Sequence, residues 1–228
     1  MYKQTIRLII NFCRFHWKTW GIAKKFVHQN VPYFSQWESA DLAGEILAQK
    51  ISATEDPKWQ GSGAESREEY AEWSWNGCGM SCLKMILAHR QEVTIPLVTL
   101  AKQCLQYGGY QKPLKTSPGL FYKPFCAFAE QEYGLKAKTS SALTFAEIIY
   151  TLNKKGYVIA SVNAEIHNPE NNPTKTGGHL VLIIGYDREK KILIFHNPSG
   201  RNQLNQKAVE LSYQQFKKFF AYKGIIVQ

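Results

Sequence analysis

The sequence has few cysteines, no long apolar run and, over its first 37 residues, no acidic side chain. Its five cysteines are Cys13, Cys78, Cys82, Cys104 and Cys126. Their odd number and irregular spacing fit neither a disulfide framework nor a C-x-x-C pair, which favours a reducing compartment. Because no stretch reaches about 18 apolar residues, we expect no membrane-spanning helix. We therefore expect a cytoplasmic protein, although a weak cleavage-like triplet ending at Ala23 leaves export open.

The missing acidic residues make the charge of the chain uneven. Residues 1–37 contain six Lys or Arg side chains, so the remainder carries only +4 of the formal net charge of +10. If this stretch is helical, its side chains separate into an apolar face and a basic face. The apolar face comprises Ile6, Ile9, Ile10, Cys13, Trp17 and Trp20, and the basic face comprises Lys3, Arg7, Arg14 and Lys18.

This basic amphipathic N-terminal arm, residues 1–30, could be used in two ways. We expect its apolar face to dock on the rest of the protein and its charges to face water. The alternative is a weak contact of the arm with an anionic membrane surface or an acidic partner, which is typical of basic amphipathic helices. The sequence carries no recognised motif for reading nucleic acid, so we expect no specific nucleic-acid partner.

The order of the sequence patterns predicts an α+β fold, with a helical first half packed on an antiparallel β-sheet from the second half. Apolar residues recur at helical spacing up to about residue 155, and short β-rich runs separated by turns follow. We expect helices at 38–51, 78–89, 94–107, 120–133, 144–155 and 213–221, and strands at 157–163, 178–186, 191–196, 208–212 and 224–228. Residues 31–228 should form one domain, with an insertion at about residues 38–75 that includes a polar loop at 53–72.

The segment from Asn76 to Leu87 contains the strongest candidate for a catalytic nucleophile. Asn76-Gly77 is a turn dipeptide, and the apolar spacing after it predicts a helix that begins at or near Cys78. The unpaired N–H groups and the dipole of a helix N-terminus favour negative charge, so we expect Cys78 to ionise readily to a thiolate. Gly77 and Gly79 would let the backbone approach a substrate closely. The other four cysteines lie on predicted apolar faces and are expected to be buried.

A thiol nucleophile needs a base and a group that orients the base. His179 begins an apolar strand directly after Gly177 and Gly178, and Asn197 follows the next strand. If the two strands pair through the turn at residues 187–190, both polar side chains emerge at the same end of the hairpin. Asn197 could then hold the imidazole of His179 through a ring N–H···O bond.

Catalysis by a thiol also needs donors for the oxyanion that forms on the substrate carbonyl. Gln36 is the candidate side-chain donor, because it lies at a turn after the extended segment 31–35 and its amide could face the site. The backbone N–H of Cys78 would supply the second donor.

Four motifs occur in this order along the chain: Val31–Gln36, Asn76–Leu87, Gly177–Asp187 and His196–Gly200. Together they resemble the motifs of papain-like cysteine peptidases related to the bacteriocin-processing, double-glycine leader peptidases. The resemblance covers roughly residues 31–228 and implies a papain-like fold that hydrolyses bonds in a peptide or protein substrate, with no metal or organic cofactor. It further implies that Cys78 is the nucleophile, His179 the general base and acid, Asn197 the orienting residue and Gln36 an oxyanion-hole residue.

The sequence departs from this family in several ways. In transporter-linked members the oxyanion Gln lies a few residues before the nucleophile, whereas Gln36 lies far upstream of Cys78. The insertion at about residues 38–75 explains this difference, as in stand-alone relatives. Gly77 and Asn197 stand where relatives often have Asp. No transporter domain follows the peptidase motifs, so we do not expect cleavage to be coupled to secretion.

Three other interpretations are open: one keeps the reactive thiol, one keeps only the fold, and one replaces the catalytic site with a metal site. The same thiol could transfer an acyl group to an amine, as in an acyltransferase or amidase, or the fold could be a non-catalytic peptide-binding module. The third interpretation is a zinc site, although the C-x3-C-x6-H spacing fits no usual ligand set. Its ligands would be Cys78, Cys82 and His89 with His179 or His196. The cysteine peptidase hypothesis accounts for all four motifs together, and we prefer it for that reason.

Overall fold

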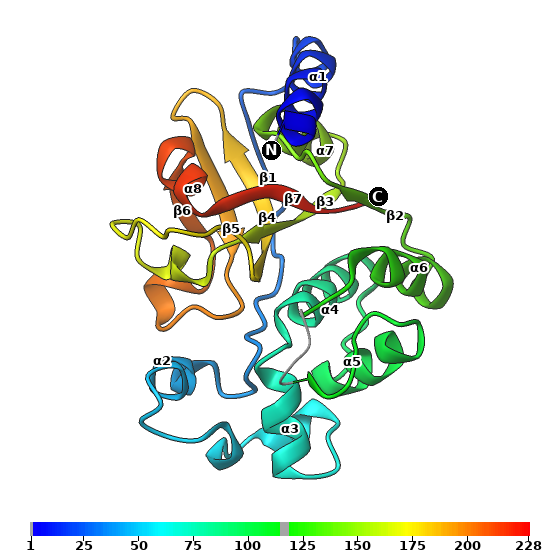
Figure 1. Cartoon of the computed structure of the whole chain (residues 1–228), viewed down its shortest axis with the longest axis vertical. Helices are drawn as coiled ribbons and strands as arrows, with labels where there is room; N and C mark the ends of the chain where they lie inside the picture. Colours follow the sequence, from blue (N-terminus) through cyan, green and yellow to red (C-terminus); the bar gives the residue numbers. More distant parts are fainter. Residues whose placement is uncertain (1, 115–118) are drawn as a thin grey trace.

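The structure is a computed structural model that describes residues 2–114 and 119–228, with side chains from residue 5 onward. Helices dominate the first half of the chain, and they pack against a sheet built mainly by the second half (Figure 1). The expected α+β fold is therefore confirmed. In the described part of the chain, no helix is long and apolar enough to cross a membrane.

Apart from the helix expected at residues 38–51, the helices predicted from apolar periodicity form within a few residues of their predicted bounds. The α-helices are α1 (Tyr2–Lys18), α2 (Ala43–Leu47), α3 (Arg67–Ser74), α4 (Cys78–Gln91), α5 (Leu97–Gln106), α6 (Tyr122–Tyr133), α7 (Phe145–Asn153) and α8 (Tyr213–Phe219). α6 is followed by Gly134 in the left-handed conformation, with a φ of 64°. Glycine is favoured there because it has no Cβ to clash in that conformation.

Seven strands, all antiparallel to their neighbours, form one sheet within the described residues. They are β1 (Lys25–Val27), β2 (Ala137–Ser140), β3 (Tyr157–Val162), β4 (His179–Asp187), β5 (Ile192–His196), β6 (Val209–Ser212) and β7 (Phe220–Val227). Their order is β2-β7-β3-β4-β5-β6, and β1 pairs with the far end of β4. β4 and β5 form the expected hairpin. The sequence did not predict β1 and β2, which are only three and four residues long.

The two faces of the sheet carry separate hydrophobic cores, because successive side chains of a strand point to opposite faces. Leu180, Leu182 and Ile184 of β4 pack with α4, α5 and α6 on one face. Val181 and Ile183 of the same strand pack with α7 and α8 on the other face. Each fully buried aliphatic side chain contributes about 1.5–3 kcal/mol. Burial on both faces therefore fixes β4 firmly against α4.

The helix expected at residues 38–51 is a wrong prediction. Only a 3-10 turn at Ala40–Leu42 and the short α2 form there. The backbone N–H and the hydroxyl of Ser39 both bind the Asp56 carboxylate, at 3.0 and 2.6 Å, and hold the start of the segment outside a helix. The segment ends at Gln49, which takes a φ of 56°.

The polar loop expected at residues 53–72 is also wrong in its second part, which forms most of α3. The Ser66 hydroxyl caps this helix by accepting the N–H of Glu69 at 3.1 Å. Tyr70 and Trp73 are completely buried. With only two large apolar anchors among charged residues, the helix leaves a weak periodic signal in the sequence.

The N-terminal arm forms α1, but the expectation that its apolar face docks on the protein is wrong. α1 packs on α7 through Phe15, whose ring lies 5.5 Å from that of Tyr150, and through Asn11, which donates to the carbonyl of Ala142 at 2.9 Å. The predicted apolar face points outward, and Cys13 within it is exposed rather than buried. The turn before α7 presents a backbone carbonyl, that of Ala142, to α1. Asn11 can donate a hydrogen bond to this carbonyl and an isoleucine cannot, so the side of α1 that carries Asn11 faces α7.

Candidate active site

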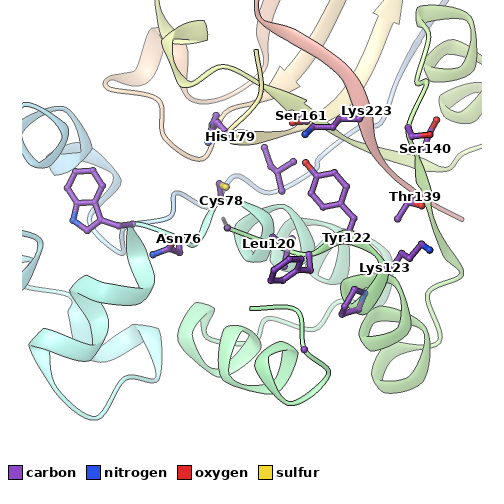
Figure 2. A pocket seen from close by; sticks show the side chains of 18 residues that line it. Asn76, Cys78, Leu120, Tyr122, Lys123, Thr139, Ser140, Ser161, His179 and Lys223 are labelled. Carbon is purple, nitrogen blue, oxygen red and sulfur yellow. The ribbon is translucent and has the colours of Figure 1, made fainter. Parts of the chain in front are cut away.

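A cleft of about 680 Å³ lies between the helical half and the sheet. Cys78 lines it from the helical side and His179 from the sheet side, and Figure 2 labels both side chains at this cleft. Asn197 and Gln36 do not line the cleft but lie buried behind it. The structure thus brings two of the four predicted site residues to one surface and places the other two in its support.

Cys78 is the first residue of α4, as the sequence predicts. The two flanking glycines are closely packed by other parts of the protein. A Cβ on Gly79 would lie 2.5 Å from Leu120 and 3.1 Å from Leu180, and one on Gly77 would lie 3.0 Å from Leu97. Other parts of the protein already fill the space that a larger side chain would need.

The Cys78 thiol is half-buried, and its surroundings favour the neutral form. Burial raises the pKa of Cys78 to about 11, although backbone hydrogen bonds from Leu180, Gly79 and Cys78 itself act to lower it. Desolvation of the charged form therefore outweighs the effect of the helix N-terminus. The raised pKa favours the thiol form of Cys78 over the expected thiolate, so attack on a substrate requires a base.

His179 begins β4 after a sharp entry of the chain. Gly177 and Gly178 have φ values of 90° and 91°, a left-handed conformation that favours glycine. The expected ring hydrogen bond is present, with His179 Nε2 lying 2.8 Å from Asn197 Oδ1. Because an amide oxygen only accepts, Nε2 carries the hydrogen and Nδ1 keeps the lone pair.

The protonation state of His179 suits a base. Burial lowers the pKa of His179 to about 4, while the hydrogen bond to Asn197 acts to raise it. The imidazole is therefore neutral near pH 7. Among the described residues, Nδ1 has no hydrogen-bond partner, which leaves its lone pair free to accept a proton.

Ser199 is a polar neighbour of His179 that the sequence analysis missed. Its hydroxyl lies 2.9 Å from His179 Nε2, and its N–H and hydroxyl donate to Asn197 Oδ1 at 3.2 and 3.4 Å. In the structure, Leu182 pairs with His196, and the same register puts Ser199 level with His179. Ser199 therefore fixes both the imidazole and the amide that holds it.

Gln36 belongs to a buried strap, residues 33–37, that runs between α4 and the loop after β5. The Ser35 hydroxyl and the Gln36 N–H both donate to the carbonyl of Pro198 at 3.0 Å. The Ser35 carbonyl accepts the hydroxyl of Ser81 from α4 at 3.2 Å. The side-chain oxygen of Gln36 is buried and has no partner among the described residues. These contacts hold Gln36 near the site without placing its amide in the cleft.

The described lining of the cleft combines lysines and hydroxyl groups with apolar side chains. The polar lining includes Tyr122, Lys123, Thr139, Ser140, Ser141, Ser161 and Lys223, with no Asp or Glu among the described lining residues, and the apolar lining includes Trp75, Leu120 and Phe121. Tyr122 points toward Ser161 and Lys223 in Figure 2. Burial raises the pKa of Tyr122, and the hydrogen bond with Ser161 acts to lower it. No pattern in the sequence indicated that these residues line one cleft, because they are scattered along the chain.

The structure does not assemble the zinc site that was considered as an alternative. Within the described residues, no three His, Cys, Asp or Glu side chains are grouped as metal ligands. His89 instead contacts the hydroxyl of Tyr157 at 2.6 Å and the carbonyl of Gln29 at 2.8 Å. His196 contacts the carbonyl of Val31 at 3.1 Å.

Comparison with known proteins identifies the family and the fold of the chain. The family model described as the Peptidase C39 like family matches residues 28–223. A solved structure from Bacillus anthracis, described as a C39-like peptidase, superimposes with a TM-score of 0.54 at 14% sequence identity. The match covers 90% of this chain and 97% of the other chain, which shows a shared fold. Comparison with curated proteins gave no match.

Proposed function

Because this chain belongs to the peptidase C39-like family, we propose that it is a cysteine peptidase that hydrolyses peptide bonds with Cys78, His179 and Asn197. One observation carries the proposal. Cys78 and His179 line the same cleft from opposite sides, and the ring of His179 is held by Asn197 at 2.8 Å so that Nδ1 is the free nitrogen. A thiol beside an oriented imidazole is the arrangement that nucleophilic catalysis by cysteine requires.

In the proposed first step, Cys78 Sγ attacks the carbonyl carbon of the scissile amide. The thiol proton passes to His179 Nδ1 as the S–C bond forms, because both groups rest in their neutral forms. The backbone N–H of Cys78 and the amide of Gln36 are the proposed donors to the oxyanion. For Gln36 this requires its side chain to turn toward the cleft once a substrate is bound. The imidazolium then gives its proton to the leaving amine as the C–N bond breaks, which leaves a thioester on Cys78.

In the second step, water enters the place of the amine. His179 Nδ1 removes a proton from the water as its oxygen attacks the thioester carbonyl. The S–C bond then breaks, the proton returns to Cys78 Sγ, and the new carboxylic acid leaves. Asn197 stabilises the imidazolium in both steps by accepting the Nε2 hydrogen.

The lining of the cleft supports a direction of substrate preference. The described lining includes Lys123 and Lys223 but no acidic side chain. Opposite charges attract most strongly where water is partly excluded. We therefore expect peptide substrates with an Asp or Glu side chain near the scissile bond to be preferred.

Cleavage of a mixed-sequence peptide library, read by mass spectrometry, tests this function. The purified chain should cut peptides and enrich products with acidic residues near the cut. Cys78→Ala should lower cleavage by about 10³-fold or more, because the nucleophile is lost. Cys13→Ser is the matched control, since Cys13 is exposed and lies on α1, outside the cleft.

Equal cleavage by the wild type and the Cys78→Ala variant would exclude this mechanism, provided that both unfold at similar temperatures. Adding a small amine such as glycinamide separates hydrolysis from acyl transfer. A hydrolase releases free carboxylates, whereas an acyltransferase releases amides in proportion to the added amine.

A further inference from the structure

The outward face of α1, together with Trp20 in the turn after it, carries most of the exposed large apolar side chains among the described residues. Ten large hydrophobic residues are exposed, and six of them lie between residues 6 and 20. They are Ile6 at 39%, Ile9 and Ile10 at 59%, Phe12 at 52%, Trp17 at 76% and Trp20 at 85% exposure. A contiguous apolar face of this kind marks an interaction site.

The opposite face of α1 is already occupied, so the exposed face is not left over from a loose helix. Phe15 is buried against Tyr150, and Asn11 binds the carbonyl of Ala142. Arg7 reaches the hydroxyl of Ser141 at 3.5 Å. These contacts hold α1 on α7 and fix which side of the helix faces outward.

Basic residues border the apolar face. Arg14 lies beside it on the helix, with Arg7 and Lys18 further round toward the docked side. The guanidinium of Arg14 and the ammonium of Lys18 lie 5.5 and 5.6 Å from the Phe15 ring. No Asp or Glu occurs before Glu38, and the acidic side chain that lies near Arg7 and Arg14 is Glu147 of α7, which shares their hollow with Lys138. The surface therefore combines exposed apolar side chains with a net positive charge.

The geometry points to an anionic membrane surface as the ligand of this face, with α1 lying flat and its isoleucines and tryptophans at headgroup depth. The apolar side chains would leave water, and the basic border would meet lipid phosphates. Tryptophan is favoured at this depth because its ring is apolar and its N–H can bind polar groups. No described helix could instead span the bilayer.

A second copy of the chain fits this face less well. Two α1 helices that packed their apolar faces together would also bring Arg7 and Arg14 of both copies close together. The arm has no acidic side chain to compensate these like charges. An anionic lipid surface removes the repulsion and satisfies the same apolar face.

The position of α1 allows the protein to work while bound. Figure 1 places α1 at one end of the long axis and α3 at the other, with α4 and α6 between them. Cys78 at the start of α4 and Tyr122 at the start of α6 line the cleft. Lipid binding through α1 would therefore hold the peptidase at a membrane and leave the cleft open to water.

Flotation of the full chain with lipid vesicles tests the proposal. Vesicles of phosphatidylcholine mixed with phosphatidylglycerol should bind the wild type and lose it at high salt, while phosphatidylcholine alone should bind at least about tenfold more weakly. The double variant Ile9→Ser/Ile10→Ser should bind the anionic vesicles about tenfold or more weakly. Arg14→Gln should weaken binding about fivefold.

The matched controls remove equivalent side chains elsewhere on the surface. Val93→Ser/Leu204→Ser removes two exposed apolar side chains, and Arg90→Gln removes an exposed charge, and neither should change vesicle binding. All replaced residues are exposed, so circular dichroism should show intact folding. Equal binding by wild type and Ile9→Ser/Ile10→Ser, or no binding to anionic vesicles, would overturn the proposal. Self-association lost in that variant would instead assign the face to a second copy.

Discussion

Across the cleft, the helical side offers one reactive group, Cys78, whereas the sheet side carries three linked polar residues. His179 lies 2.8 Å from Asn197 and 2.9 Å from Ser199, and Asn197 accepts two further hydrogen bonds from Ser199. Around Cys78, by contrast, burial raises the thiol pKa to about 11. In the proposed mechanism, the base that activates the Cys78 thiol therefore has to come from the sheet side of the cleft.

This difference also explains how each side is built. α4 is surrounded by core residues, so the position of Cys78 is set by packing that is rigid and apolar. The position of His179 is set by hydrogen bonds at the end of a hairpin. Substitution of Cys78 on the helical side should therefore abolish peptide cleavage. Substitutions on the sheet side should reduce cleavage less, the further the replaced residue lies from the imidazole of His179.

Removal of the base should give the largest effect on the sheet side. His179→Ala should lower peptide cleavage by about 10³-fold, because Cys78 with its raised pKa would have no group to accept its proton. Steady-state cleavage of a fluorogenic peptide measures the loss. His16→Ala on the exposed surface of α1 is the control and should leave the rate unchanged. A His179→Ala rate within tenfold of the wild type would contradict the proposed role of His179.

Removal of the support should give smaller, graded losses. Asn197→Ala should lower kcat/KM by about 10–100-fold, and Ser199→Ala by about 3–10-fold, because each loses a hydrogen bond that orients the imidazole. Since the bond from Asn197 raises the pKa of His179, the Asn197→Ala variant should retain activity to lower pH. The pH profile of kcat/KM measures this shift.

In the wild type, kcat/KM should fall as the pH drops toward about 4 and His179 gains a proton. Ser199→Thr keeps the hydroxyl and should recover most of the loss seen with Ser199→Ala. If Ser199→Thr were as slow as Ser199→Ala, the hydroxyl would not be the group that positions His179.

Acid should weaken the sheet side through a second buried imidazole, with the smallest expected effect. His196 accepts the N–H of Ala208 at Nδ1 and contacts the carbonyl of Val31 at Nε2. Burial lowers the pKa of His196 from 6.5 to about 4, so the unfolded chain takes up a proton first as the pH falls. Stability is therefore complete above pH 6.5 and is lost as the pH falls toward 4.

Between pH 7 and 5, the unfolding free energy of His196→Gln should fall by roughly 1–2 kcal/mol less than that of the wild type. Urea unfolding at the two pH values, followed by circular dichroism, measures it. An unchanged pH dependence in His196→Gln would show that this imidazole does not carry the acid sensitivity.

The sequence predicted the parts of the site that local patterns determine. The period-2 run after Gly178 and the turn at residues 187–190 were enough to pair β4 with β5 and to bring Asn197 to His179. The contact of Ser199 with His179 could not be predicted. It depends on a register shift between Ile183 and Gly185, and such an irregularity has no sequence signature. The charge state of Cys78 also depends on desolvation, which only the tertiary structure sets.

The N-terminal arm shows the same limit on a larger scale. Helical periodicity identified which side of α1 is apolar, and the helix formed as expected. Periodicity could not tell which side of α1 contacts the protein. Asn11 and Phe15 dock on α7 and the turn before it through contacts that depend on the tertiary structure. Periodicity therefore predicts an amphipathic helix, and only packing shows which face is free.

The strap at residues 33–37 has a consequence for how peptides enter. It is bonded to the loop after β5 through Ser35 and Gln36, and to α4 through the hydroxyl of Ser81. The strap therefore ties the helical side of the cleft to the sheet side through hydrogen bonds, which oppose a separation of the two sides. In the proposed reaction, a cleft that opens little would admit a substrate best as an extended chain, so we expect unstructured tails to be cut far more readily than folded domains.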